Sequence, residues 1–97
     1  MSDAHAIRLK RLKFRAWHRG FVEADLILGP FVDNHARDLS EAQLDALEHL
    51  LDQPDQDIYA WIVERVPTPP EFDGEIMNMI KAFRDVAHKS LGAPHGG

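Results

Sequence analysis

Histidines are the first residues in this chain that could do chemistry, because clustered imidazoles can bind a metal ion or transfer a proton. The sequence has six of them. No His-x-x-x-His or Glu-x-x-His spacing places two strong ligands on one face of a helix. His49 follows Asp45 and His88 follows Asp85 at helical spacing, but such pairs are typical of ordinary local side-chain contacts. We therefore expect no metal site.

Residues for covalent or acid–base catalysis are also poorly placed. The chain has no cysteine, which excludes cysteine nucleophiles, disulfides and thiolate metal sites. Its serine and threonine side chains lie near the ends, at a predicted helix cap or between prolines: Ser2, Ser40, Thr68 and Ser90. Neighbouring carboxylates such as Asp55 and Asp57 lie at a predicted helix start, where capping and the helix dipole explain them. No glycine-rich phosphate loop is present, so we expect no catalytic or cofactor-binding residue and no enzyme activity.

One short stretch, Arg19-Gly20-Phe21-Val22-Glu23, allows two interpretations. Gly20 can end one helix in the left-handed conformation, and Glu23 then lies at the positive N-terminus of the next helix. That explanation leaves Arg19 without a role. A forked, always charged guanidinium beside a glycine that lets another backbone approach is also an arrangement for recognising a partner. From the residues alone, a joint between helices and a docking site are equally good interpretations.

The charged residues are divided unevenly along the chain, whose net charge is −5. Residues 1–20 contain six of the 11 Lys and Arg but only one of the 16 Asp and Glu. A basic segment of this kind suits nucleic acid, lipid or an electrostatically steered protein partner. Because the acidic remainder repels phosphate, we expect a protein partner and no nucleic acid.

The sequence is typical of a protein in a reducing, aqueous compartment. No apolar run approaches the roughly 20 residues of a membrane span, and the first 20 residues lack the apolar core of a secretory signal. A basic, acid-poor start is also typical of mitochondrial targeting segments, but here it leads into the helical pattern without a linker. We expect a cytoplasmic protein with no membrane segment.

Apolar residues recur at helical spacing along the chain, and no alternating strand pattern appears. The sequence therefore predicts an all-α fold, a compact five-helix bundle that forms a single domain over residues 1–97 and is monomeric. Order is expected from about residue 6 to residue 91, with frayed ends. Helix breaks are predicted near Gly20 and near residues 37–39, 53–54 and 66–69.

Capping residues and prolines set the expected helix boundaries. Ser40 and Gln43 have the spacing of a capping box at the start of the third helix. Either Asp55 or Asp57 is expected to cap the fourth helix, and Pro70 is expected in the first turn of the fifth.

The second helix contains a Gly29-Pro30 pair, which should kink or divide it because Pro30 cannot donate a hydrogen bond to the preceding turn.

The first helix carries Ile7, Leu12 and Trp17 among its apolar positions. Helical spacing in the later helices predicts the following core residues: Leu44, Leu47, Leu51, Ile58, Trp61, Ile76, Ile80 and Phe83.

The stretch Arg19–Glu23 also matches a family motif, RGxxE, and its surroundings match as well. Upstream, RLKFRAWHRG (residues 11–20) resembles the family's basic first helix, and LGPF (residues 28–31) resembles its second helix. LSEAQLDALEHLLDQPDQDIYAWI (residues 39–62) resembles its capped helix and the acids that follow, and GEIMNMIKAF (residues 74–83) is similar to its last helix. On these residues the chain resembles the succinate dehydrogenase assembly factor family over about residues 8–83.

The resemblance implies an all-helical assembly factor that is not an enzyme. Members bind the flavoprotein subunit of succinate dehydrogenase, and in some bacteria that of fumarate reductase, and they promote covalent attachment of FAD to a histidine of that subunit. The FAD would belong to this client protein, so no tightly bound cofactor is expected here. The motif carries partner binding over to Arg19, Gly20 and Glu23. The expected partner-binding set also includes Arg15, Phe21 and Asp25, and the region of Asp57 and Trp61 is carried over with it.

An alternative is an antitoxin-like or nucleic-acid-binding regulatory module that uses the basic first helix. The antitoxin part of this alternative comes from the resemblance, since one bacterial relative is described as an antitoxin. A further expectation concerns the motif itself. If Arg19 and Glu23 contact a partner rather than the fold, their side chains should be exposed, and truncating either should change stability by only about 0–1 kcal/mol.

Overall fold

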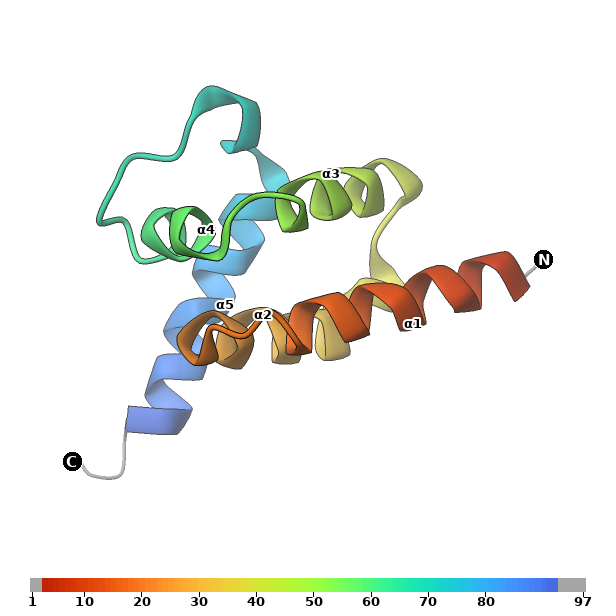
Figure 1. Cartoon of the computed structure of the whole chain (residues 1–97), viewed down its shortest axis with the longest axis horizontal. Coiled ribbons are helices and arrows are strands. Elements are labelled where there is room, and N and C mark those ends of the chain that lie inside the picture. Colours follow the sequence, from red (N-terminus) through yellow and green to blue (C-terminus); the bar gives the residue numbers. More distant parts are fainter. Residues whose placement is uncertain (1–2, 93–97) are drawn as a thin grey trace.

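The computed structural model describes residues 3–92 and consists of helices and their connections in this range (Figure 1). Five α-helices follow one another along this part of the chain: α1 (Asp3–Trp17), α2 (Val22–His35), α3 (Glu41–Leu51), α4 (Asp55–Ile62) and α5 (Glu75–Gly92). Two short 3-10 helices, η1 (Ala36–Asp38) and η2 (Pro70–Phe72), lie between them. The all-α, five-helix prediction is confirmed, and the helix breaks occur where they are expected. Of the ends that were expected to fray, residues 1–2 and 93–97 lie outside the described range, whereas residues 3–5 belong to α1 and residue 92 to α5.

Helix α2 is the central helix of the fold. It packs against α1, α4 and α5 and continues into η1. Its sequence explains this position, because it is apolar around most of its circumference and buries six residues, among them Ile27, Leu28 and Phe31. A helix of this kind is stable only where other elements cover it. Figure 1 shows α1 alongside α2 and α5 crossing the bundle.

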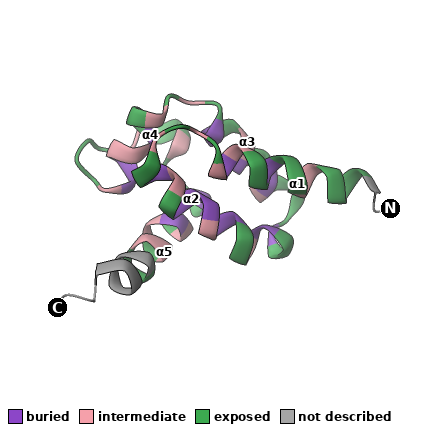
Figure 2. Ribbon diagram, turned by 60° about the horizontal axis from the view of Figure 1, so that its bottom comes forward, coloured by how far each residue is buried: buried purple, intermediate pink, exposed green. Residues whose placement is uncertain are grey.

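The core lies between the inward faces of the helices, as the buried residues in Figure 2 show. All but one of the predicted core residues are buried, and the exception, Phe83, is partly buried against the core. Its ring makes an edge-to-face contact with the buried Phe31, with ring centroids 5.9 Å apart. Among its described side chains, α1 contributes Leu12 and Ala16 to the buried core and Leu9 packs partly buried against it, while its predicted apolar position Ile7 is 53% exposed.

The side chain of Trp17 packs against α2 at Gly29. A Cβ atom added at Gly29 would lie 2.4 Å from two ring carbons of Trp17, so the indole of α1 packs directly on the backbone of α2. The Trp17 Nε1–H also donates to Asp33 Oδ2 at 3.1 Å. Helix α2 runs without interruption through Pro30, so of the two expected effects of Gly29-Pro30, division of the helix does not occur. The glycine is explained by close helix packing rather than by a break.

The start of α3 confirms the predicted capping box. Ser40 Oγ accepts from the Gln43 N–H at 3.1 Å, and Gln43 Oε1 accepts from the Ser40 N–H at 2.8 Å. The prediction for α4 is wrong, because its N-cap residue is Pro54 and no side chain caps it. The carboxylate of Asp55 is instead bound by another side chain, as described below.

The predicted start of the fifth helix is also wrong. Pro70 begins the short helix η2, and α5 begins only at Glu75. Asp73 separates the two with non-helical dihedral angles (φ −92°, ψ 85°). Proline fits the first turn of either element, because its missing N–H is not needed there, so the residue itself does not distinguish η2 from α5.

The C-terminus of α4 closes with a residue in the left-handed conformation. The Arg65 N–H donates to the Ala60 carbonyl at 2.8 Å and the Glu64 N–H donates to the Trp61 carbonyl at 3.1 Å, which is the Schellman pattern. Glu64 has φ of 62° at the position where glycine is usual. Arg84 of α5 donates to a carbonyl of the last turn of α4 at 2.7 Å. This turn is therefore closed by hydrogen bonds despite an unfavourable residue.

We expect Gly29→Ala to destabilise the fold by about 1–3 kcal/mol, because the indole of Trp17 has to move away from a new methyl group. Urea unfolding measures the change. In a Trp17→Leu background the obstruction is absent, and the same alanine should be neutral or stabilising through its better helix propensity. An equal loss in both backgrounds would show that Gly29 is needed for another reason.

We expect Glu64→Gly to raise the free energy of unfolding by about 1 kcal/mol, because glycine adopts the left-handed conformation without a Cβ penalty. Thermal melts would detect this as a higher Tm. Glu64→Ala is the matched control, since it removes the carboxylate but keeps the strain, and it should not stabilise. A stabilising alanine would mean that the carboxylate, and not the backbone, is unfavourable.

Candidate functional site

The turn between α1 and α2 carries the RGxxE motif and is the candidate site. Gly20 is exposed and has φ of +82°, so the predicted left-handed joint is present. A Cβ atom added at Gly20 would meet nothing within 4 Å. Within this chain, glycine is therefore required by the backbone conformation and not by lack of space.

Arg19, the first residue of the motif, is bound inside the fold. Only 9% of its side chain is exposed, and its Nε–H donates to Asp55 Oδ1 at 2.5 Å. Its Nη2–H donates to the Gln53 carbonyl at 2.9 Å, and its backbone N–H donates to Asp25 Oδ1 at 3.3 Å. We call these four residues the Arg19 latch: Arg19, Asp25, Gln53 and Asp55. The expectation that the Arg19 side chain is exposed is wrong. The small effect of truncating Arg19 on stability was expected for an exposed side chain, so that expectation loses its basis.

The Arg19 latch joins the α1–α2 turn to the connection between α3 and α4. A guanidinium this well covered needs an opposite charge and a partner for its remaining N–H groups, since an unpaired buried charge is strongly unfavourable. Asp55 supplies the charge, and the Gln53 carbonyl accepts a second N–H group. The latch thus fixes the position of Gly20 relative to the rest of the domain.

Two more of the predicted partner-binding residues also make contacts within the domain. Arg15 Nη2 lies 2.6 Å from Asp52 Oδ1. Phe21 is half-buried at the N-cap position of α2, and its ring centroid lies 5.2 Å from that of Tyr59 in α4. The structure therefore brings all six predicted residues to one corner. Four of them make contacts with other residues of the same domain: Arg15, Arg19, Phe21 and Asp25.

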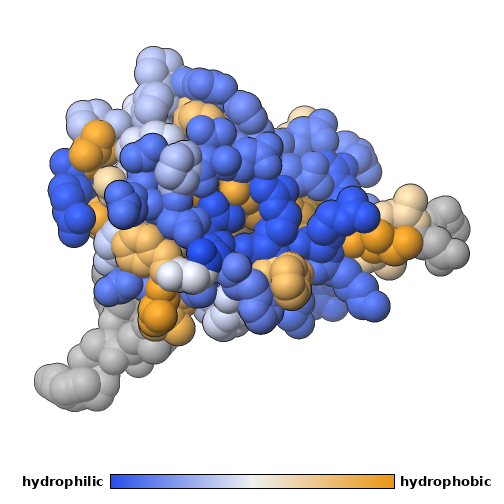
Figure 3. All heavy atoms as spheres, in the orientation of Figure 1, coloured by the Kyte–Doolittle hydropathy of each residue, from blue (hydrophilic) through white to orange (hydrophobic). Residues whose placement is uncertain are grey.

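Gly20 and Glu23 are the predicted residues that face outward. Glu23 lies exposed in the first turn of α2 and forms no hydrogen bond or ion pair with any other part of residues 3–92. Two apolar side chains one helical turn apart flank it, because Val22 is 66% exposed and Leu26 is 40% exposed. Figure 3 shows apolar groups where α1 meets α2, on a face that is otherwise mostly hydrophilic. We call these four residues the corner surface: Gly20, Val22, Glu23 and Leu26.

Val22 and Leu26 were not expected in the site. Helix α2 is apolar on most sides, so its sequence pattern does not reveal which apolar residues remain exposed. In the region of Asp57 and Trp61, the two side chains lie in different surroundings. Trp61 is only 8% exposed and stacks on Phe72 with ring centroids 5.2 Å apart, whereas Asp57 is exposed.

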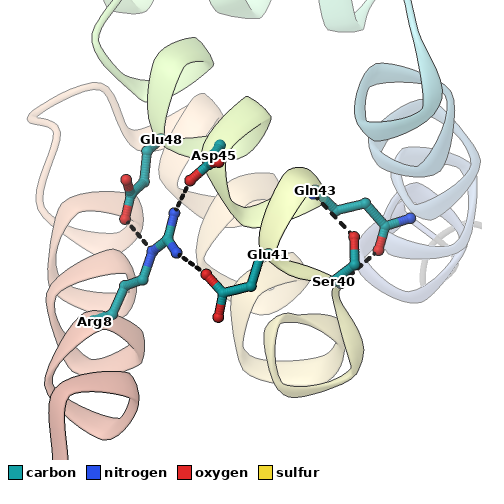
Figure 4. Close-up of polar contacts among 6 residues, drawn as sticks. All are labelled: Arg8, Ser40, Glu41, Gln43, Asp45 and Glu48. Atoms are coloured by element: carbon teal, nitrogen blue, oxygen red, sulfur yellow. Dashed lines mark hydrogen bonds and ion pairs between the residues drawn. The ribbon is translucent and has the colours of Figure 1, made fainter.

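The basic first helix is partly neutralised by α3. Arg8 contacts three carboxylates of that helix (Figure 4): its Nη1 lies 2.8 Å from Glu41, its Nη2 2.5 Å from Asp45 and its Nε 2.7 Å from Glu48. The hydrogen bonds that Arg8 donates to Glu48 and Asp45 raise the pKa of Arg8 above its ordinary value. The sequence contains a signal for this pairing. Arg8 and Arg15 lie two helical turns apart, and the acids 41, 45, 48 and 52 follow one another at intervals of three or four residues, so each set lies on one side of its helix.

Among residues 3–92, no group of three His, Asp or Glu side chains is arranged to hold a metal ion. No helix in this part of the chain is both long and apolar enough to cross a membrane.

Comparison with known proteins agrees with the motif. Residues 10–84 match the family model described as "Flavinator of succinate dehydrogenase". Succinate dehydrogenase assembly factor 2-B, mitochondrial, of Drosophila persimilis is 43% identical over 76 residues, which cover 76% of this chain and 48% of that protein. The FAD assembly factor SdhE of Acetobacter pasteurianus is 41% identical over 69 residues, covering 71% and 63%. Succinate dehydrogenase assembly factor 2, mitochondrial, of Danio rerio is 36% identical over 98 residues, covering 96% and 61%.

The chain thus spans about half to two thirds of the length of these relatives. The matched residues include the whole of the α1–α2 turn and every residue of the Arg19 latch. On this match, the chain belongs to the family of flavinators of succinate dehydrogenase.

Proposed function

We propose that this chain is an assembly factor that binds the flavoprotein subunit of succinate dehydrogenase and promotes covalent attachment of FAD to that subunit. Membership of the flavinator family and the name of the bacterial FAD assembly factor support the proposal. The structural observation that carries it is the corner surface, where an exposed glycine and an exposed carboxylate lie between exposed apolar side chains.

The proposed mechanism is binding without catalysis by this chain. A protein that binds one arrangement of its client better than another shifts the client toward that arrangement. Holding the flavin and the accepting histidine of the client close together and correctly oriented would then accelerate bond formation. In this mechanism the factor is not an enzyme and holds no cofactor of its own, because the FAD belongs to the client.

The corner surface suits this mechanism physically. Val22 and Leu26 can bury apolar area against a client, and Glu23 can accept hydrogen bonds from it. Gly20 permits close approach of another backbone, since nothing projects from it. The Arg19 latch holds these groups in place before binding, which reduces the entropy lost on association.

The proposal also covers the oligomeric state of the protein, its compartment and a second client. We infer a monomer that acts in the cytoplasm. One similar protein is bacterial, while the animal relatives are named as mitochondrial. The flavoprotein subunit of fumarate reductase is a second client of the same chemical kind. The nucleic-acid alternative loses support, because Arg8, Arg15 and Arg19 are engaged by carboxylates of the same chain.

A complementation experiment tests the function. The chain is expressed in a bacterium that lacks its own assembly factor of this family, and covalent flavin is measured on the denatured flavoprotein subunit. We expect flavinylation to be restored. Flavinylation that stays at the level of the empty vector, with the chain present and folded, would contradict the proposal.

In thermal melts we expect Glu23→Ala to leave the Tm within a few degrees of wild type. In binding measurements with the purified client it should weaken binding about tenfold or more, as loss of an important interface residue does. Glu75→Ala is the matched control, since Glu75 is likewise an exposed acid in the first turn of a helix. It removes the same favourable interaction with a helix dipole, about 0.3–1 kcal/mol. Equal binding by both variants would exclude Glu23 from the interface.

A further inference from the structure

A groove runs along α1 on the side that faces α2 and η1. It consists of two hollows of about 420 and 270 Å³, and Lys10 and Lys13 line both of them. The larger hollow has an apolar floor that includes Leu9 and Val32, and Arg37 lies at its rim. The smaller hollow continues past these lysines to Phe14, Trp17 and His18. We call the two hollows together the basic groove.

The positive charge of the basic groove is available to a partner. Lys10 and Arg37 are exposed and form no ion pair within residues 3–92. Lys13 lies 3.6 Å from Asp33, with 62% of its side chain exposed. Asp33 is the one carboxylate among the described residues that line the groove, and its other oxygen already accepts from Trp17. The groove is therefore positively charged on a chain whose net charge is −5.

The groove also offers apolar surface beside this charge. Phe14 is 64% exposed and stacks on His18 with ring centroids 4.4 Å apart. Both residues lie in or just after the last turn of α1, immediately before the RGxxE motif. The groove thus leads along α1 to the turn that carries the corner surface.

We propose that the basic groove docks an acidic segment of the client flavoprotein, with carboxylates on Lys10, Lys13 and Arg37 and an apolar side chain on the floor. This proposal rests on the proposed function and adds a second contact to it. Charge complementarity selects acidic side chains, and the apolar floor favours a protein segment over nucleic acid, whose phosphates would leave it uncovered. The acidic residues elsewhere in the chain also repel a long polyanion.

The test compares two adjacent charges on α1. Lys10→Glu reverses a charge inside the basic groove, and Arg11→Glu makes the same reversal at an exposed residue outside its lining. Binding of wild type and both variants to the purified flavoprotein subunit is measured by biolayer interferometry at low and high salt, after melts confirm that each variant folds. A short DNA duplex and phosphatidylserine vesicles are measured alongside as polyanions.

We expect Lys10→Glu to raise the dissociation rate about tenfold at both salt concentrations, because it removes a contact within the interface. Arg11→Glu should only slow association, by a few-fold, and only at low salt, because it changes the long-range field. Equal effects of the two variants would overturn the groove as a docking site and leave only electrostatic steering.

Two further outcomes separate the proposals. Tight wild-type binding to the flavoprotein with no effect of Lys10→Glu would overturn this inference alone, whereas no wild-type binding would overturn the proposed function with it. Tighter binding to the duplex or the vesicles than to the flavoprotein, lost in Lys10→Glu, would assign the groove to a polyanion instead.

Discussion

The well-covered guanidinium of Arg19 is the interaction on which the candidate site depends. It joins a turn between two helices to a connection 34 to 36 residues further along the chain. A left-handed glycine alone would leave the direction of the turn weakly defined, because glycine has access to many backbone conformations. With Arg19 bound to Asp55 and Gln53, the exposed Gly20 and Glu23 have one position relative to the core. The motif therefore combines a residue that sets the geometry with residues that present a surface.

The same electrostatic pairing organises the larger structure. The basic first segment and the acidic remainder of the chain suggest an external partner for the positive charge, yet part of that charge is engaged by α3 and the residues just after it. Arg8, Arg15 and Arg19 face Glu48, Asp52 and Asp55 in the same order along the two segments. This pairing helps to hold α1, which contributes few residues to the core. Lys10, Lys13 and Arg37 take no part in this pairing, and they give the basic groove its positive charge.

The fold is largely predictable from the sequence because it rests on local signals. Helical periodicity, the Ser40 capping box and the left-handed Gly20 are each determined by residues close together in the chain. Two departures from the prediction involve distant contacts, whereas the third, the start of α5, arises because Pro70 suits the first turn of η2 and of α5 alike. Asp55 does not cap α4 because Arg19 binds its carboxylate, and Gly29 does not divide α2 because its role is to seat Trp17. Within the site, the motif identifies the corner, but only tertiary structure shows that Arg19 faces inward and that Val22 and Leu26 face outward.

A double-mutant cycle on Arg19 and Asp55 tests most directly whether the latch organises the site. Free energies of unfolding are measured by urea denaturation for wild type, Arg19→Ala, Asp55→Ala and the double variant. The account predicts a loss of about 2–4 kcal/mol for Arg19→Ala and a coupling energy of about 1–3 kcal/mol, because removing either partner leaves the other covered and unpaired. The more exposed Arg15–Asp52 pair should couple by only about 0–1 kcal/mol. Losses for Arg19 and Asp55 that add to within about 0.5 kcal/mol would contradict the account.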